Sequence, residues 1–196
     1  FQRMPRQDIV SWSAIIAAYA QHGCGKYAVD LYNRMLDEGV STDKISLIHL
    51  LSACSHDGLV DEALKQFMTV MNEDCKVIII DHFNCMVDIL GRAGRLDDAE
   101  RLLLELPFKY SSVAWTTLLG ACRSQVDLVR GERAANRVFE LDPEATAPYI
   151  TLSNLYFSAG RVDDALNVIK RMRQKGLVKQ ADGIPIEVLG ESASKG

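Results

Sequence analysis

Residues 149–172 read YITLSNLYFSAGRVDDALNVIKRM, and this stretch decides the fold. Leu152, Leu155 and Tyr156 recur at the spacing of one helix face. After Gly160 a second stripe with the same periodicity follows, formed by Ala165, Val168, Ile169 and Met172. The acidic pair Asp163-Asp164 opens this second stripe, where it suits the positive end of a helix dipole. The stretch therefore predicts a helical hairpin.

The same pattern recurs along the chain. A glycine is followed five residues later by a small residue at Gly23, Gly58, Gly94 and Gly160, while Val126 with Gly131 keeps the offset without the turn glycine. A large apolar residue stands eleven residues before each position: Trp12, Leu47, Phe83, Trp115 and Tyr149. Both markers share one phase, with steps of 35, 36, 32 and 34 residues.

These markers predict five units, at 9–43, 44–79, 80–111, 112–145 and 146–180. A lone hairpin cannot bury its apolar stripe, whereas stacked neighbours can. We therefore expect an all-α fold, a right-handed α-solenoid of stacked helical hairpins with about ten helices.

Composition excludes several classes of protein. The chain has 196 residues, 48% of them apolar, and its 22 Lys+Arg against 26 Asp+Glu give a net charge of −4. That charge argues against a protein that binds polyanions through bulk charge. The apolar run Val77–Ile80 is too short for a membrane span. The sequence begins at Phe1 rather than Met, so we expect a fragment of a longer protein.

Five scattered cysteines favour reduced thiols over a disulfide framework. His82 with Cys85 and Cys54 with His56 invite a metal interpretation, but the sequence has no Cys-x2-Cys pair of the kind that structural zinc uses. We predict no metal, and buried structural roles for Cys54 and Cys122.

The residues of several units resemble the pentatricopeptide repeat family of plants. Residues 8–19 (DIVSWSAIIAAY) are similar to the start of such a repeat, residues 51–62 (LSACSHDGLVDE) to its long variant and residues 88–96 (DILGRAGRL) to its short variant. Residues 118–123 and 152–156 resemble the two E-type motifs that close the PLS class. The resemblance assigns residues 1–8 to the tail of a preceding repeat and 9–43, 44–79 and 80–111 to P-, L- and S-type repeats. It assigns 112–145 and 146–180 to the E-type motifs and 181–196 to a C-terminal linker or tail.

This resemblance implies a sequence-specific RNA-binding and docking module of an organellar cytidine-to-uridine editing factor. In the family, the fifth and last residues of a unit read one base and the second residue packs against it. The base-reading residues would be Ser13 with Asp43, a guanine-type pair, and Asn84 with Ser111, a pyrimidine-type pair. The base-packing residues would be Val10 and Asp81. Ile48 and Ile79 have no hydrogen-bonding group, so the second unit would read little.

The resemblance also implies partners and a location: single-stranded organellar RNA, a DYW-type cytidine deaminase domain in cis or in trans, and other editing-factor proteins, in a mitochondrion or chloroplast. It implies no membrane and no cofactor. The sequence itself lacks the His-x-Glu and Pro-Cys-x-x-Cys elements of a deaminase, so we expect a non-enzymatic chain. A positive surplus in residues 146–196 offers candidate phosphate or partner contacts at Lys170, Arg171, Arg173, Lys175 and Lys179, although a solvated helix end is an equally simple explanation.

A tetratricopeptide-type scaffold that holds a peptide in its concave face is the alternative. Residues 141–176 are similar to that family. Such scaffolds commonly hold peptide carboxylates with inner-face Lys or Arg, and residues 115–122 and 149–159 contain neither. The RNA-binding interpretation is therefore favoured.

Overall fold

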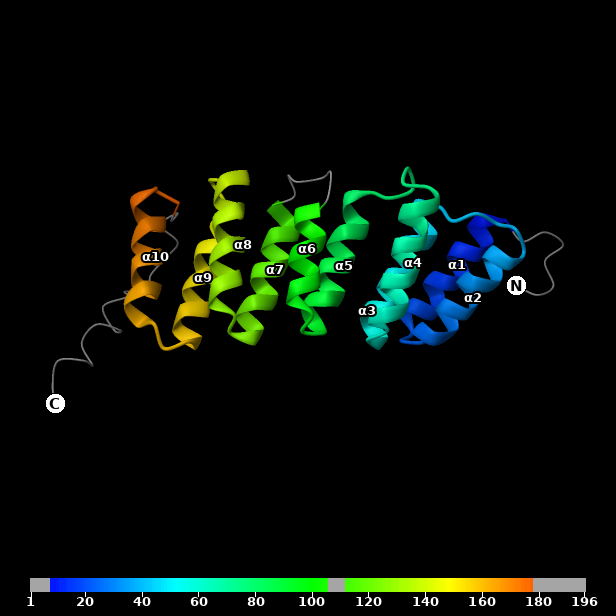
Figure 1. Ribbon diagram of the computed structural model, residues 1–196, viewed down its shortest axis with the longest axis horizontal. Coiled ribbons are helices and arrows are strands. Elements are labelled where there is room, and N and C mark those ends of the chain that lie inside the picture. Colours follow the sequence, from blue (N-terminus) through cyan, green and yellow to red (C-terminus); the bar gives the residue numbers. More distant parts are fainter. Residues whose placement is uncertain (1–7, 106–111, 178–196) are drawn as a thin grey trace.

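The computed structural model describes residues 8–105 and 112–177, and it arranges them as ten helices in a single row of hairpins (Figure 1). The first helix of each hairpin is α1 (Ile9–Gln21), α3 (Lys44–Asp57), α5 (Ile80–Arg92), α7 (Ser112–Gln125) and α9 (Ala147–Ser158). The second helix is α2 (Gly25–Asp37), α4 (Val60–Glu73), α6 (Leu96–Glu105), α8 (Leu128–Leu141) and α10 (Val162–Gln174). The described residues contain no strand, and the expected α-solenoid is confirmed.

The contacts between helices divide the solenoid into two layers. First helices pack on one another in an unbroken series, α1 on α3, α3 on α5, α5 on α7 and α7 on α9. In the described part of the chain no two second helices approach backbone to backbone, and each packs closely on first helices while side chains alone link it to the next second helix. The first helices therefore form the inner layer, and the second helices form the outer layer.

One continuous core runs through the inner layer. The large apolar residue of each unit is buried at its centre, including Trp12, Leu47, Phe83, Trp115 and Tyr149. The small residue of each second helix is also fully buried, as at Ala28, Ala63 and Ala99, because it lets that helix approach its neighbours closely. Both markers of the sequence are thus core positions of their hairpins.

The turns between paired helices have the same geometry in all five hairpins. Gly23, Gly58, Gly94 and Gly160 have left-handed backbones, with φ between 65° and 79°. Val126 adopts the same conformation, with φ of 57°. A left-handed backbone is costly for a β-branched residue, so the turn of the fourth hairpin is strained.

No helix within residues 8–105 and 112–177 combines the length and apolar character that a membrane crossing requires.

Candidate nucleic-acid interface

The second residue of each predicted repeat lies at the start of an inner helix, and its side chain is exposed. Val10 on α1 is 71% exposed, and Ile45 on α3, Asp81 on α5 and Val113 on α7 are exposed as well. These exposed side chains share one register position and form a row, in which the aliphatic members on α1, α3 and α7 offer surfaces for flat apolar groups and α5 contributes the acidic Asp81. Both predicted base-packing residues, Val10 and Asp81, lie in this row.

Ser13 and Asp43 come from neighbouring helices of the inner layer. Ser13 lies one turn into α1 and Asp43 is the residue before α3, and these two helices pack together. Ser13 is only 7% exposed, and its buried hydroxyl has no hydrogen-bond partner. Buried hydroxyls are nearly always paired, so this unsatisfied group requires an explanation.

Asp43 has its orientation fixed by the helix it begins. Its Oδ1 accepts a hydrogen bond of 2.7 Å from the Ser46 backbone N–H, and the Ser46 hydroxyl lies 3.0 Å from the Asp43 backbone N, which donates to it. This reciprocal cap holds the carboxylate at the amino end of α3. Asp43 remains half-buried, so it presents a fixed anionic acceptor at the junction between the first two units.

The second predicted pair is described only in part. Asn84 lies half-buried on α5, one turn after the helix start, and it already makes a polar contact within the protein. Ser111 lies outside the described residues. The structure therefore places Asn84 in the inner layer but does not show whether Ser111 accompanies it.

The other units offer little for hydrogen bonding at these positions. In the second unit, Ile48 and Ile79 are both half-buried aliphatic residues, so neither side chain can hydrogen-bond to a base. In the fourth unit, the Thr116 hydroxyl donates a hydrogen bond of 2.7 Å to the Ser112 carbonyl, so it is committed to its own helix. Ile150 on α9 is exposed and apolar.

Sequence reasoning missed a hollow of about 580 Å³ between α5 and α7. Its floor is made of small residues, Gly91, Gly120 and Ala121, and Arg92 and Arg123 lie at its rim. Arg92 is paired with Asp88 at 3.0 Å. Because α7 continues to Gln125, this inner helix carries Arg123, and the inner layer is less free of cations than residues 115–122 suggested. The signal in the sequence was the presence of small residues, Gly91 on α5 and Gly120 and Ala121 on α7, within two neighbouring inner helices.

The five cations expected near the C-terminus do not form one cluster. Lys170, Arg171, Arg173 and Lys175 are all exposed, and Lys179 lies outside the described residues. At 100° per residue, Lys170 and Arg173 project from one side of α10, whereas Arg171 and Lys175 project from the opposite side. Lys175 contacts the ring of Tyr149, with its Nζ 5.9 Å from the ring centroid.

His82 has a structural role that the sequence did not reveal. It is fully buried, and its Nδ1 accepts a hydrogen bond of 3.0 Å from the Ile79 backbone N–H. The neutral ring therefore carries its proton on Nε2, which donates at 2.9 Å to the Lys44 carbonyl. Burial lowers the pKa of His82. The imidazole thus links the starts of α3 and α5, next to the residue that caps α3.

The thiols are packing groups. Cys54 and Cys122 are fully buried, and burial raises the pKa of each to about 12, so neither forms a thiolate readily. Over the described ranges, no group of three or more His, Cys, Asp or Glu side chains is arranged to hold a metal ion.

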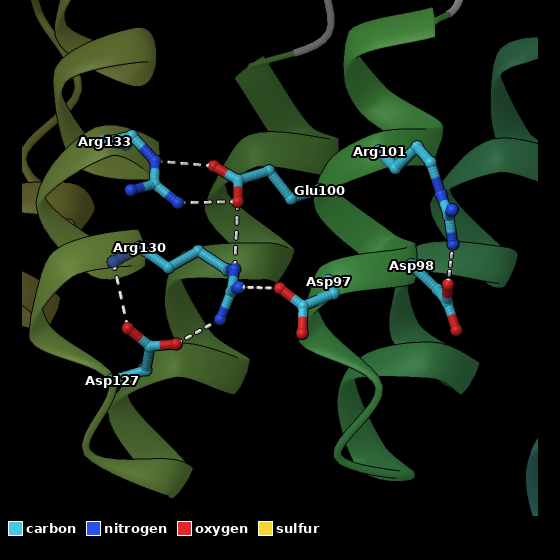
Figure 2. A network of polar contacts seen from close by, with 7 residues as sticks. All are labelled: Asp97, Asp98, Glu100, Arg101, Asp127, Arg130 and Arg133. Carbon is cyan, nitrogen blue, oxygen red and sulfur yellow. Dashed lines mark hydrogen bonds and ion pairs between the residues drawn. The ribbon is translucent and has the colours of Figure 1, made fainter.

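Ion pairs set the spacing of the outer layer. Glu100 on α6 accepts hydrogen bonds from Arg133 at 2.7 Å and from Arg130 at 3.0 Å, both on α8 (Figure 2). Arg130 also pairs with Asp97 and Asp127. These contacts hold the pKa of Glu100 low, chiefly through the hydrogen bond from Arg133. Figure 2 shows that they bridge the gap between two outer helices that do not touch.

Models of known protein families match most of the chain. The model of the PPR repeat family matches residues 7–56, and that of the PPR repeat matches residues 46–75 and 81–109. The model of the E motif matches residues 125–185. The chain belongs to the pentatricopeptide repeat family. Its repeats and its E motif are consistent with the PLS class.

Relatives of this pentatricopeptide repeat chain come from Arabidopsis thaliana. A mitochondrial pentatricopeptide repeat-containing protein is 43% identical over 179 residues, which are 91% of this chain and 29% of the relative. The chloroplastic protein DOT4 is 39% identical over 191 residues, 97% of this chain and 22% of the relative. The chain thus spans about a quarter of the length of these relatives.

Among solved structures, the crystal structure of the pentatricopeptide repeat protein PPR10 from maize has a TM-score of 0.71 at 25% identity. The match covers 89% of this chain and 26% of PPR10. PPR10 in complex with an 18-nt RNA element has a TM-score of 0.62 at 18% identity, with the same coverage.

Proposed function

We propose that this chain is a specificity and docking module for single-stranded RNA. The observation that carries the proposal is the junction of the first two units, where α1 and α3 pack together and supply an exposed aliphatic side chain, a buried unpaired hydroxyl and a fixed carboxylate. Val10 would pack against the face of a base, and Ser13 and Asp43 would contact its edge. The binding of RNA by PPR10, which shares the fold, supports this class of ligand.

The family resemblance assigns guanine to the Ser13 and Asp43 pair, and the chemistry of the junction is compatible with guanine. A carboxylate accepts hydrogen bonds only, and guanine offers N–H donors on its Watson–Crick edge. The Ser13 hydroxyl supplies the donor or acceptor that the base leaves unmatched, and in doing so it would gain the partner that it lacks. By the same resemblance, the third unit would read a pyrimidine through Asn84 and Ser111, and the Asn84 amide can both donate and accept hydrogen bonds.

The electrostatics of the chain favour recognition of bases over affinity for phosphate. The net charge is −4, and most described arginines on the outer layer are paired with carboxylates. Arg92 on α5 and Arg123 on α7 are inner-layer cations that line the hollow between these helices. Two or three bases read at about 1–3 kcal/mol each give weak binding by this segment alone.

We further propose that the host protein is an organellar factor for cytidine-to-uridine editing. The E motif over residues 125–185 and the mitochondrial and chloroplastic relatives support this proposal. In it, residues 112–180 present or recruit a DYW-type deaminase domain, in cis or in trans, and this chain performs no chemistry itself.

The decisive experiment measures base preference. The chain is joined to upstream repeats of known specificity, and binding is measured to four RNAs that differ only at the base opposite the first unit. The native chain should prefer guanine, and Ser13→Asn should move the preference towards a pyrimidine. Ala14→Asn is the matched control, since it adds the same amide to the neighbouring exposed position of α1. An unchanged preference in Ser13→Asn would refute the role of Ser13 and Asp43.

A separate pull-down tests recruitment. A separately expressed DYW-type deaminase domain should be retained by the chain and lost when residues 112–196 are deleted. Equal recovery with and without those residues would refute the docking role.

A further inference from the structure

One side of α10 is uncovered in the described structure, and the register of the solenoid shows what kind of contact it is shaped for. Each of the earlier second helices packs on the first helix of the following hairpin, α2 on α3, α4 on α5, α6 on α7 and α8 on α9. Within residues 8–105 and 112–177, α10 contacts α9 alone, at the end of the row (Figure 1). Its far side therefore corresponds to a surface that is covered in every other hairpin.

Comparison of equivalent positions identifies the residues of this surface. The eighth residue of the second helix is fully buried at Tyr32, Phe67 and Ala135, but the equivalent Ile169 is only half-buried. Val162 and Leu166 are 49% and 53% exposed. With Lys170 and Arg173 they follow one stripe of α10, spanning about 100° of the helix. We call Val162, Leu166, Ile169, Lys170 and Arg173 the open side of α10.

The contacts of α8 show how a helix lies on this surface. Phe139, the twelfth residue of α8, packs on Tyr149 near the start of α9, with ring centroids 4.2 Å apart. Glu132, the fifth residue of α8, accepts a hydrogen bond of 2.8 Å from the Tyr156 hydroxyl, near the end of α9. The covering helix therefore runs antiparallel, and it places two residues seven positions apart against the second helix.

The residues of α10 change the chemistry at both contacts. The equivalent of Phe139 is Arg173, and the equivalent of Glu132 is Leu166. A covering helix must therefore supply an anionic side chain where Tyr149 lies and an apolar side chain where Tyr156 lies. No acidic side chain of the described residues pairs with Lys170 or Arg173. By contrast, an ion pair to a carboxylate of the preceding outer helix is formed by Arg95, Arg130, Arg133 and Arg161, which lie on or just before the later outer helices.

We infer that the open side of α10 is a docking site for an amphipathic helix of a partner protein, with an acidic residue opposite Arg173 and an apolar residue two turns later opposite Leu166. Such a helix extends the solenoid by one more inner element. The apolar residues on the stripe favour a protein over RNA, because a phosphate chain gains nothing from Leu166 and Ile169. This inference is independent of the base-reading residues, which lie at the other end of the row.

A helical peptide derived from the protein itself provides the probe. Residues 146–161 form the helix that covers α8, so a stapled peptide of this sequence with Tyr149→Glu and Tyr156→Leu has the predicted complementarity. Its counterpart with Tyr149→Lys places a cation at the same position. In titrations of the full 196-residue chain, the Glu peptide should bind at least about fivefold more tightly than the Lys peptide.

A charge reversal on α10 tests the site with a matched control. K170E/R173E should reverse the preference, so that the Lys peptide binds more tightly than the Glu peptide. R171E/K175E makes the same change of charge on the opposite side of the same helix and should leave the preference intact. Circular dichroism verifies that both variants keep their helical content.

Four results would overturn the inference. The first is an equal effect of the two double variants on the peptide preference, and the second is a loss of RNA affinity in K170E/R173E with no change for the peptides. The third is binding of the Glu peptide only after residues 178–196 are deleted, and the fourth is self-association of the chain that K170E/R173E abolishes. The second would make the surface an RNA contact, the third would assign it to the chain's own C-terminal segment, and the fourth to a second copy.

Discussion

Gly25 is a position where the addition of a single methyl group should be costly, because the nearest atom belongs to the backbone of a packed helix. It is the first residue of α2, and it is buried against the end of α3. A Cβ atom built there would lie 2.7 Å from the Ala53 carbonyl oxygen and 2.8 Å from Asp57 Cγ. The Gly25 backbone N–H also donates a 2.6 Å hydrogen bond to Asp57 Oδ2, so the methyl group and the bond compete for the same space.

The expected cost of Gly25→Ala follows from these distances. The Ala53 oxygen belongs to the backbone of a packed helix and cannot rotate away, so α2 and α3 must separate by several tenths of an ångström. Overpacking of this kind costs about 1–3 kcal/mol. The higher helix propensity of alanine offsets less than about 1 kcal/mol of this overpacking cost, and the offset is smaller still at a helix end. We expect a net loss of about 2 kcal/mol and a fall in Tm of about 4–8 °C.

Gly120→Ala is the matched control, because the same substitution there should have the opposite sign. Gly120 lies in the middle of α7, and a Cβ atom built there meets no atom within 4 Å. Alanine should therefore stabilise the helix by about 0.5–1 kcal/mol. Thermal and urea denaturation followed by circular dichroism measure both variants. A neutral Gly25→Ala would show that the packing of α2 on α3 is looser than the structure indicates. A Gly120→Ala that destabilises the protein would show that the space beside Gly120 is not open.

Three further predictions concern the same architecture. Val126→Gly should raise the free energy of unfolding by about 1 kcal/mol and Gly160→Val should lower it by about 1–2 kcal/mol, because both positions have left-handed backbones. Urea titration measures both changes, and changes of the same sign would contradict the assignment of strain to Val126. Stability should fall as the pH drops below about 6.5, because burial lowers the pKa of His82 in the fold and the unfolded chain therefore takes up the proton first. Urea midpoints at pH 8 and pH 5.5 measure this loss of stability. The difference between the two midpoints should be smaller in His82→Gln, and an equal difference would show that His82 is not its source. Glu100→Gln should cost about 1–2 kcal/mol, because Glu100 is 12% exposed and pairs with two arginines, whereas Glu38→Gln in the exposed pair with Arg34 should cost less than about 0.5 kcal/mol. Denaturation of both variants at low salt checks the difference, and equal losses would contradict it.

The hairpins could be predicted from the sequence because their signals are local. Helical periodicity, turn glycines and the large apolar residue of each unit all lie within one hairpin, and each observed hairpin falls inside one of the five units. The types of repeat assigned to those units, and their exact limits, stay predictions.

The site could be predicted only in part, because its properties depend on contacts between units. Nothing local to Ser13 indicates that the packing of α1 and α3 buries it, and nothing near His82 indicates its bond to Lys44, 38 residues away. The division of the C-terminal cations is different. The spacing of Lys170, Arg171 and Arg173 already places them on two sides of a helix, so the sequence held that information.

The ion pairs of the outer layer lead to a prediction about shape. Inner helices pack directly, whereas the second helices are linked across the gap only by side chains, among them Arg95 to Asp61 at 2.8 Å and Arg133 to Glu100 at 2.7 Å. Each of these two pairs has at least one partner that is more than half exposed, Asp61 in the first and Arg133 in the second, so both are weakened at high salt. The outer layer should then spread while the inner layer stays packed, and the row of hairpins should curve more tightly.

Small-angle X-ray scattering at about 0.05 M and 1 M salt measures this change, because the Debye length of the solution falls from more than about 10 Å to about 3 Å between these concentrations. The radius of gyration should fall at high salt, and Glu100→Gln should reproduce part of the fall at low salt. A radius that is the same under both conditions would show that the inner layer alone sets the curvature. In that case the distance between the base-reading junctions would be independent of the outer ion pairs, and RNA affinity would depend on salt through phosphate contacts only.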